Sequence, residues 1–290
     1  MLPKEIIETM VEKFGKSFRI ISERALGGGS INQAARIETT EGIFFVKWNN
    51  AKAYPQMFKK EATSLKILRN TESIHIPKVV MYNENGSDSF LLLEYIESQQ
   101  PQRGFWQDFA YSLAALHKHS NDSFGLDFDN YIGSLWQSNR KHDSWSDFFV
   151  EERMLPQIKM ARDSSLLYSQ QSQNFDKLFS KLEGIFPEEK PALLHGDLWS
   201  GNFMADEKGQ ACIFDPAIYY GNRIMDIAMS RMFGGFSSDF YRFYNEAFPL
   251  ENNWEEQAEL ANLYPNLVHL NLFGTAYLSA IDRILKHFTA

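Results

Sequence analysis

The chain has 290 residues, of which 44% are hydrophobic and 23% are charged, and its 29 basic and 37 acidic residues give a formal net charge of −8. This balance argues against a protein that binds nucleic acid through general basicity, because phosphate backbones demand an excess of Lys and Arg. No stretch approaches the run of about 20 apolar residues that crosses a bilayer, and the single cysteine, Cys212, cannot form an intrachain disulfide. We therefore expect a cytoplasmic protein without nucleic-acid or membrane partners.

The first 96 residues predict a small β-rich lobe. Residues 18–48 indicate three strands in succession, connected by turns at 27–32 and 39–42. A helix is expected over 56–69, where apolar residues have helical spacing, and a second hairpin is expected over 78–96.

Beyond Ile96 the pattern becomes mainly helical, with one β-rich interruption. Helices are expected over 105–118, 145–162, 173–186 and most of 225–290. The interruption, residues 192–217, indicates a short strand, a polar loop and a hairpin that turns at 206–209. We therefore predict an α+β fold of two lobes, a small β-rich N-terminal lobe over 1–96 and a larger, mainly helical lobe over 97–290.

The strongest chemical signal is the segment HGDLWSGN, residues 195–202, which is followed by Asp215. Asp215 ends an apolar strand, where a carboxylate is costly unless a cation meets it. Because Mg²⁺ prefers oxygen ligands, we expect Asn202 and Asp215 to bind this ion, which leaves Asp197 to accept a proton from a substrate hydroxyl. The alternative is a polar turn that Asp and Asn side chains cap.

A second set of charged residues lies on apolar faces of the β-rich lobe. Lys47 shares one face of its strand with Ile43 and Phe45, and Glu61 falls within the apolar stripe of the helix 56–69. A buried ammonium and a buried carboxylate each need a partner, so we expect the two to pair and Lys47 to meet a polyphosphate. Two exposed charges on poorly predicted elements are the alternative.

A glycine-rich connection, Gly27 to Ser30, joins the first two predicted strands. Glycines there let backbone N–H groups approach phosphate oxygens, because no Cβ intervenes, although three glycines by themselves more often mark a plain hairpin turn. The sequence contains no GxxxxGK[ST], HExxH, GxSxG or paired CxxC motif. This excludes the usual P-loop, zinc-protease, serine-hydrolase and thiol-redox interpretations.

The order of these features, a glycine-rich turn, a strand Lys, a helix Glu, HxDxxxxN and a later Asp, resembles the layout of protein-kinase-like phosphotransferases. Three departures separate the chain from protein kinases. Gly196 replaces the Arg of HRD, Trp199 replaces the Lys two positions after the catalytic Asp, and Asp215-Pro216-Ala217 replaces DFG. The resemblance therefore favours a small-molecule kinase.

Within that group the chain resembles the fructosamine kinase, or ketosamine kinase, family over nearly its whole length. The matching segments are GGGSIN at 27–32, FFVK at 44–47, LHKHS at 116–120, FGLDFDNYIG at 124–133, HGDLWSGN at 195–202 and FDPAIYYGNR at 214–223, together with Glu61 and Asp226. Ile224 stands where the family usually has Glu, which removes a local partner for Arg223. The Asp that matches Asp226 braces the catalytic loop in kinase folds, and the resemblance implies the same role here.

The resemblance implies a kinase that uses ATP and Mg²⁺ to phosphorylate O3′ of the sugar in a ketosamine, the adduct of an amine with a sugar. ATP is expected between the lobes, and Asp197 is the implied catalytic base. The implied nucleotide contacts are Glu94, Tyr95 and Ile96 for the adenine and Gly28, Gly29, Ser30, Lys47 and Glu61 for the phosphates.

The implied acceptor pocket includes Trp199, whose ring can pack against a sugar, and Asp127 and Asp129, whose charge can attract the cationic amine of a ketosamine. A packing residue and a solvated loop are the respective alternatives. The expected partner is a small ketosamine or a glycated protein, and the expected assembly is a monomer or a weak homodimer. The nearest rivals are kinases of this fold that act on aminoglycosides, choline or sugars. A catalytically silent nucleotide-binding module and a purely structural protein are less favoured.

Overall fold

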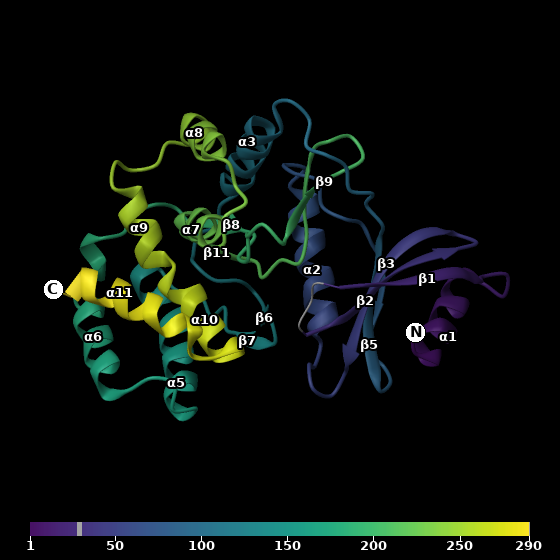
Figure 1. Ribbon diagram of the computed structural model, residues 1–290, viewed down its shortest axis with the longest axis horizontal. Helices are drawn as coiled ribbons and strands as arrows, with labels where there is room; N and C mark the ends of the chain where they lie inside the picture. Colours follow the sequence, from purple (N-terminus) through teal and green to yellow (C-terminus); the bar gives the residue numbers. More distant parts are fainter. Residues whose placement is uncertain (28–30, 290) are drawn as a thin grey trace. The chain divides into compact units, whose positions relative to one another are not determined.

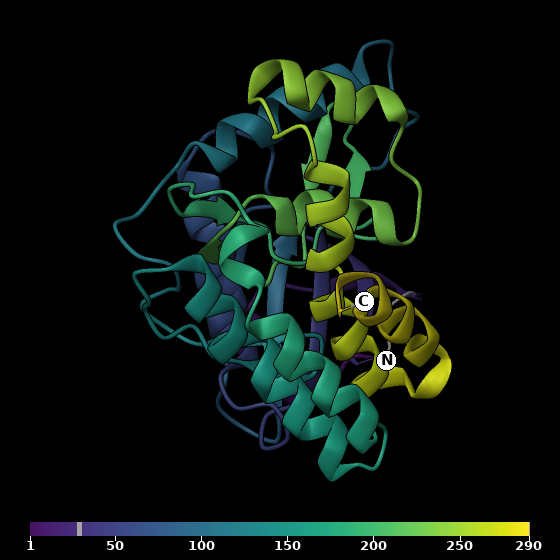
Figure 2. The same ribbon diagram turned by 90° about the vertical axis from the view of Figure 1, so that its left-hand side faces the viewer.

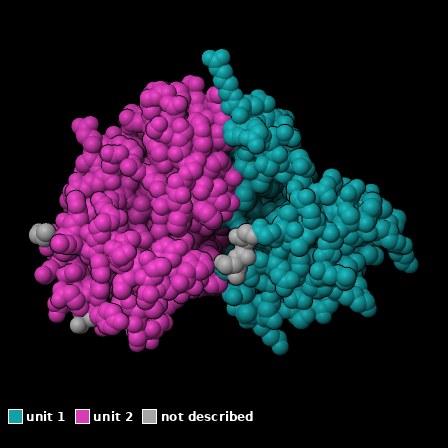
Figure 3. Space-filling model, viewed as in Figure 1, with its two compact units in different colours: residues 1–103, 204–215 teal, residues 104–203, 216–290 magenta. Residues whose placement is uncertain are grey.

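The computed structural model describes residues 1–27 and 31–289, and the chain divides into two compact units. The first unit comprises Met1–Arg103 and Met204–Asp215, and the second comprises Gly104–Phe203 and the residues from Pro216 onward (Figure 3). The units are therefore discontinuous in sequence, whereas the division that we predict between residues 96 and 97 is contiguous. The α+β character predicted from the sequence is confirmed.

The first unit is built on a five-stranded antiparallel sheet with the strand order β1-β2-β3-β5-β4 (Figure 1). Its strands are β1 (Ile20–Leu26), β2 (Gln33–Thr39), β3 (Gly42–Asn50), β4 (Val79–Asn83) and β5 (Asp88–Glu94). They correspond to the three successive strands and the second hairpin that the sequence predicts. Because β3 lies between β2 and β5, it is the central strand of the sheet.

Two helices, α1 (Lys4–Phe14) and α2 (Met57–Asn70), pack on opposite faces of this sheet (Figure 1). Side chains alternate between the two faces along a strand. Phe44, Val46 and Trp48 of β3 belong to the hydrophobic core that α1 covers. Lys47 therefore faces the other side, where its Nζ lies 6.0 Å from the ring centroid of Phe58 on α2.

The segment Met204–Asp215 joins the first unit through contacts with the loop that follows α2. Strand β10 (Ala211–Ile213) pairs with β9 (Phe203–Ala205), and the N–H of Ile213 donates to the carbonyl of His75 at 3.1 Å. The hairpin turn predicted at 206–209 is present, and the carboxylate of Asp206 lies 2.7 Å from Nδ1 of His75. These contacts place Asp215, at the end of this segment, in the same unit as Lys47.

The second unit is mainly helical (Figures 1 and 2). Its helices are α3 (Phe105–His117), α4 (Trp145–Phe148), α5 (Leu155–Asp163), α6 (Ser169–Phe179), α7 (Ile224–Met232), α8 (Ser238–Ala247), α9 (Trp254–Ala261), α10 (Leu263–Phe273) and α11 (Leu278–Thr289). Short helical turns lie at Phe149–Met154, Leu182–Gly184 and Thr275–Tyr277. Helix α11, which leads to the C-terminus, packs against α6 and α10.

Two small antiparallel sheets lie among these helices. One pairs β6 (Asn130–Ile132) with β7 (Leu135–Gln137), and the other pairs β8 (Ala192–Leu194) with β11 (Tyr219–Gly221). The second pairing joins segments that are distant in sequence, and the N–H of Ala217 donates to the carbonyl of His195 at 2.9 Å. The strand pairing and this hydrogen bond together fix the start of the loop that contains the HGDLWSGN segment.

Two predicted helices differ from the observed ones. The helix predicted over 173–186 is α6, which begins and ends earlier, and the side-chain oxygen of Gln171 caps its start by accepting the N–H of Tyr168 at 3.1 Å. The helix predicted over 145–162 is divided into α4 and α5 by a π-helical turn. None of the helices that the structure describes has both the length and the apolar composition of a membrane span.

Candidate active site

Three charged side chains of the first unit meet at one point: Lys47 on β3, Glu61 on α2 and Asp215 just after β10. Nζ of Lys47 lies 2.7 Å from Oε1 of Glu61 and forms a second ion pair with Oδ1 of Asp215. The side chain of Lys47 is 5% exposed, whereas that of Asp215 is 51% exposed. The pairing of Lys47 with Glu61, predicted from their places on apolar faces, is therefore present, and Asp215 extends it toward solvent.

Burial and neighbouring charge shift the pKa values of Lys47 and Glu61 in opposite directions. Burial lowers the pKa of Lys47, but the carboxylates of Asp215 and Glu61 outweigh it and raise that pKa above its ordinary value. Burial raises the pKa of Glu61 to about 7, against the attraction of the Lys47 ammonium. Lys47 is thus held as a cation at neutral pH, which is the form that binds an anion.

The backbone of Asp215 adopts the left-handed conformation, with φ at 60°. A residue with a Cβ pays roughly 1–2 kcal/mol for this conformation, although Asp adopts it more readily than most. Strained backbone of this kind is concentrated at ligand-binding and catalytic positions. Asp215 is therefore a candidate functional residue on grounds that do not depend on the sequence motif.

In the second unit, the loop after β8 is held by the buried carboxylate of Asp226 on α7. The backbone N–H groups of His195 and Gly196 donate to its two oxygens at 2.7 and 2.9 Å, and Nε2 of His117 lies 3.1 Å from Oδ2. Burial raises the pKa of Asp226, but its hydrogen bond with His117 and the nearby charges outweigh burial and hold the pKa below its ordinary value. The bracing contact that the resemblance implies for Asp226 is present.

Asp197 and Asn202 lie in this loop and are hydrogen-bonded to each other. Nδ2 of Asn202 donates to the main-chain oxygen of Asp197 at 2.9 Å and to its Oδ2 at 3.1 Å. Because the amide nitrogen is the donor in both bonds, neither uses the side-chain oxygen of Asn202, which is the atom that could bind a cation. Gly196 allows the turn, since its φ is 80° and a Cβ there would collide with the carbonyl of Ala217.

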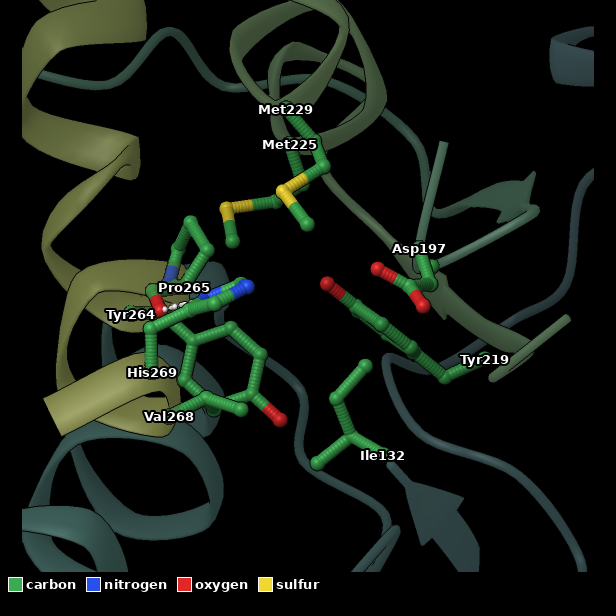
Figure 4. Close-up of a pocket in the computed structure, with 10 residues that line it drawn as sticks. Ile132, Asp197, Tyr219, Met225, Met229, Tyr264, Pro265, Val268 and His269 are labelled. Carbon is green, nitrogen blue, oxygen red and sulfur yellow. Dashed lines mark hydrogen bonds between the residues drawn. The ribbon is translucent and has the colours of Figure 1, made fainter. Parts of the chain in front are cut away.

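A pocket in the second unit opens beside Asp197 (Figure 4). Its wall is mostly apolar, with Ile132, Met225, Met229, Pro265 and Val268 among the lining side chains. Its polar residues are Asp197, Tyr219 on β11, and Tyr264 and His269 on α10. Neither Tyr219 nor His269 is among the site residues predicted from the sequence. Tyr219 lies within the FDPAIYYGNR segment, which was a usable signal, but no motif marks α10.

The three side chains predicted to contact the acceptor lie outside the lining of this pocket. Trp199 is partly buried and packs edge-on against Phe233, with ring centroids 5.5 Å apart. Asp127 is 81% exposed and forms an ion pair with Lys141 at 2.6 Å. Oδ1 of Asp129 accepts the backbone N–H of Asn139 at 2.8 Å. None of the three is among the residues that line the described pocket.

The residues predicted to contact the nucleotide lie in the first unit. Glu94 ends β5, where its carboxylate accepts the N–H of Lys78 at 2.6 Å and lies 3.4 Å from Arg69. The ring of Tyr95 lies 5.2 Å from the guanidinium carbon of Arg36, and Ile96 is buried. Gly28, Gly29 and Ser30 lie outside the described residues.

Position 224, where the family usually has Glu, is occupied by Ile, and Arg223 pairs with another carboxylate instead. Its guanidinium binds Glu189 through two bonds, at 2.9 and 2.7 Å, and donates to the carbonyl of Phe248 at 2.7 Å. Ile224 itself is buried in the core. The ion pair that the Glu would supply is thus made by a residue 34 positions earlier in the chain.

A sequence model described as fructosamine kinase matches residues 2–290. The chain belongs to the fructosamine kinase family. A relative from Enterococcus faecium, named "Probable ketoamine kinase", is 38% identical over 264 residues, which cover 90% of this chain and 93% of the relative. A protein-ribulosamine 3-kinase of Arabidopsis thaliana is 35% identical over 280 residues, which cover 94% of this chain and 84% of the relative. The protein is accordingly an ATP-dependent small-molecule phosphotransferase of the ketoamine kinase type.

Solved structures agree with this assignment. The crystal structure of a Haemophilus somnus protein named as a fructosamine-3-kinase has a TM-score of 0.88 and 30% identity, and the match covers 98% of this chain and 97% of that one. An aminoglycoside phosphotransferase in a ternary complex with AMP-PNP and hygromycin B has a TM-score of 0.66 and 16% identity over 98% of each chain. The second similarity concerns the fold, which is kinase-like.

Proposed function

We propose that this fructosamine kinase family member transfers the γ-phosphoryl group of ATP to O3′ of a ketosamine, such as the ribulose or fructose adduct of an amine. The observation that carries the proposal is the loop in which Asn202 orients Asp197 while Asp226 holds the backbone. Family membership supports the choice of a ketosamine, and the name of the Arabidopsis relative, a ribulosamine 3-kinase, supports the position of transfer.

Lys47 is the proposed ligand of the α- and β-phosphates. It is a buried cation between two carboxylates, Glu61 on a helix and Asp215 at the half-exposed end of the group. Glu61 holds the ammonium of Lys47 in one position. The lysine side chain is therefore already ordered before a phosphate binds, and binding costs less conformational entropy. We further propose that the adenine contacts Glu94, Tyr95 and Ile96 and that Gly28, Gly29 and Ser30 contact the phosphates. The AMP-PNP complex of the aminoglycoside phosphotransferase is consistent with a nucleotide ligand for this fold.

Asn202 and Asp215 are the proposed ligands of Mg²⁺, and their chemistry fits that ion. The amide oxygen of Asn202 is not used in its bonds to Asp197, and the carboxylate of Asp215 is half-exposed. Both are oxygen donors, which Mg²⁺ prefers. When bound, the ion neutralises charge on the phosphates during transfer.

Asp197 is the proposed catalytic base. Its Oδ2 accepts a bond from Asn202, which orients the carboxylate, and the residue lines the pocket in which we place the acceptor. It accepts the proton of the attacking hydroxyl, and the remainder of catalysis is positioning and charge stabilisation.

The predicted contacts with the acceptor remain Trp199, Asp127 and Asp129. We also propose that the protein acts in the cytoplasm on free ketosamines or glycated proteins, as a monomer or weak homodimer.

An acceptor screen with purified protein, ATP and Mg²⁺ tests this function. Ribulose-lysine and fructose-lysine adducts should be phosphorylated, whereas aminoglycosides and choline should not. Asp197→Asn should retain nucleotide binding and lose turnover by about 10²–10⁴-fold, which is the usual contribution of a general base. Phosphorylation of an aminoglycoside in preference to both adducts, or full turnover by Asp197→Asn, would refute the proposal.

A further inference from the structure

The pocket beside Asp197 contains a buried polar group whose presence packing does not explain. The side chain of Tyr219 is 0% exposed, and among the described residues its hydroxyl oxygen has no hydrogen-bond partner. The ring is well packed, since Phe148 stacks on it with centroids 5.5 Å apart and the guanidinium of Arg153 lies 4.0 Å from its centroid. A phenylalanine ring would keep both of these ring contacts, and in the part of the chain that the structure describes the hydroxyl has no hydrogen-bond partner to explain it.

An unsatisfied hydroxyl in a protein interior costs about 1–3 kcal/mol, and native proteins contain few of them. The neighbouring Tyr264 shows the usual arrangement, because its hydroxyl donates to Oε1 of Gln137 at 2.6 Å. Burial raises the pKa of Tyr219 to about 12, although the charge of the Arg153 guanidinium and its proximity to the hydroxyl oppose this. The hydroxyl is therefore neutral at physiological pH and can both donate and accept a hydrogen bond.

The hydroxyl of Tyr219 points into the pocket that Asp197 also lines, and His269 faces the same space from α10 (Figure 4). Nδ1 of His269 lies 2.6 Å from the carbonyl of Pro265. That nitrogen must carry the hydrogen, because a carbonyl can only accept, so Nε2 of the neutral ring is an acceptor. Burial lowers the pKa of His269, which favours this neutral form. The pocket thus presents a carboxylate, the hydroxyl of Tyr219 and an imidazole nitrogen within an apolar wall, beside Tyr264, whose hydroxyl is already bonded to Gln137.

We propose that the hydroxyl of Tyr219 forms a hydrogen bond with a sugar hydroxyl of the acceptor, adjacent to the one that is phosphorylated, and thereby selects a polyhydroxylated substrate. This inference rests on the proposed function and adds a specificity-determining residue to it. An acceptor hydroxyl that reaches Asp197 carries its vicinal neighbour into the space that Tyr219 lines. Binding of a sugar then satisfies the buried hydroxyl, whereas an acceptor without a vicinal hydroxyl leaves it unpaired and binds more weakly.

Tyr219→Phe tests the proposal, because it removes the hydroxyl and keeps the ring. We expect the KM for a ketosamine to rise about 5- to 10-fold, as the loss of one neutral hydrogen bond implies, with the KM for ATP unchanged. The melting temperature should stay the same or rise, because a costly buried group is removed. Tyr241→Phe is the matched control: its hydroxyl lies 3.2 Å from that of Ser230, away from the pocket lining, and its loss should leave the acceptor KM unchanged.

An acceptor that lacks the hydroxyl at C4′, the neighbour of O3′, completes the experiment. The wild-type enzyme should bind this analogue about 5- to 10-fold more weakly than the parent ketosamine, and Tyr219→Phe should no longer distinguish the two. If ketosamines are phosphorylated but the wild-type enzyme treats both acceptors alike, or Tyr219→Phe has the wild-type acceptor KM, the role of Tyr219 is wrong and the proposed function stands. If the wild-type enzyme phosphorylates no ketosamine, the proposed function and this inference both fail.

Discussion

The side-chain amide of Asn202 donates to both the main-chain oxygen and the carboxylate oxygen Oδ2 of Asp197, at 2.9 and 3.1 Å. Both residues belong to the loop after β8, so one short segment sets the direction of the Asp197 carboxylate. The side-chain oxygen of Asn202 takes no part in these bonds. A single residue can therefore orient the proposed base and bind the proposed metal ion.

Asn202→Ala removes both bonds and the oxygen ligand. Because the residue positions Asp197 and is a proposed Mg²⁺ ligand, we expect kcat to fall about 10- to 100-fold, the usual loss when an orienting or ligating partner is removed. The Mg²⁺ concentration that gives half-maximal activity should rise, while the KM for the acceptor should change little. Steady-state kinetics across a Mg²⁺ titration measure all three quantities, and an unchanged Mg²⁺ requirement would contradict the assignment of Asn202 as a ligand.

Gly196 and Gly234 are a matched pair of sites for substitution by alanine. Both have a left-handed backbone, with φ at 80° and 71°, respectively. The backbone strain of an alanine at either site therefore lowers stability by roughly 1–2 kcal/mol. A Cβ at Gly196 would also collide with the carbonyl of Ala217, whereas a Cβ at Gly234 would meet nothing within 4 Å. We expect Gly196→Ala to lower the free energy of unfolding clearly more than Gly234→Ala and to abolish turnover, because Asp197 is displaced. Denaturant unfolding provides the comparison, and equal losses at both sites would show that the contact with Ala217 is unimportant.

Much of the first unit follows from local patterns in the sequence. Alternation along β3 puts Lys47 on the face opposite Phe44 and Val46, and helical spacing puts Glu61 among apolar residues, so their pairing is predictable. The second partner of Lys47 is not, because Asp215 lies 168 residues away, in a segment that contacts the rest of the first unit through β10 and Asp206 at His75. These are isolated contacts between a loop residue and a distant hairpin, and no periodicity in the sequence indicates them.

The pocket of the second unit was not predictable from patterns. Helix α10 is apolar on nearly all sides and has no motif, so nothing distinguishes His269 from its neighbours in sequence. Tyr219 lies in a recognisable segment, but only the folded structure shows that its hydroxyl is unsatisfied while that of Tyr264 is bonded. The ion pair of Arg223 with Glu189 was likewise missed, since 34 residues separate the two.

Lys47→Met should destabilise the first unit, because it leaves Glu61 buried without its closest cation. Removal of one partner from a buried ion pair costs about 3–5 kcal/mol. The double variant Lys47→Met/Glu61→Leu should recover part of that loss, since no uncompensated charge remains. Neither variant should bind ATP normally, because both lack the proposed phosphate ligand. Denaturant unfolding and nucleotide titration separate the two effects, and a double variant less stable than Lys47→Met would contradict this interpretation of the pair.

His269 should make stability depend on pH. Burial holds its pKa below the ordinary value of 6.5, so the unfolded chain binds a proton at a higher pH than the folded chain does. The free energy of unfolding therefore falls as the pH drops from about 6.5 toward the pKa of His269 in the folded protein. At higher pH the imidazole is neutral in both states and has no effect on it. Melting temperatures between about pH 5 and 8 should fall more steeply with acid for the wild-type protein than for His269→Gln, in which no imidazole titrates. Parallel curves for the two proteins would show that His269 is not held neutral by the fold.

The measurement closest to the central claim is the position of the phosphate in the product. Purified protein, ATP and Mg²⁺ are incubated with a ribulosamine of lysine, and phosphorus and proton NMR of the product assign the esterified carbon. We expect a single phosphomonoester on O3′, formed by the wild-type enzyme and nearly absent with Asp197→Asn. Release of inorganic phosphate without a sugar ester, or esterification of a different hydroxyl, would contradict the account.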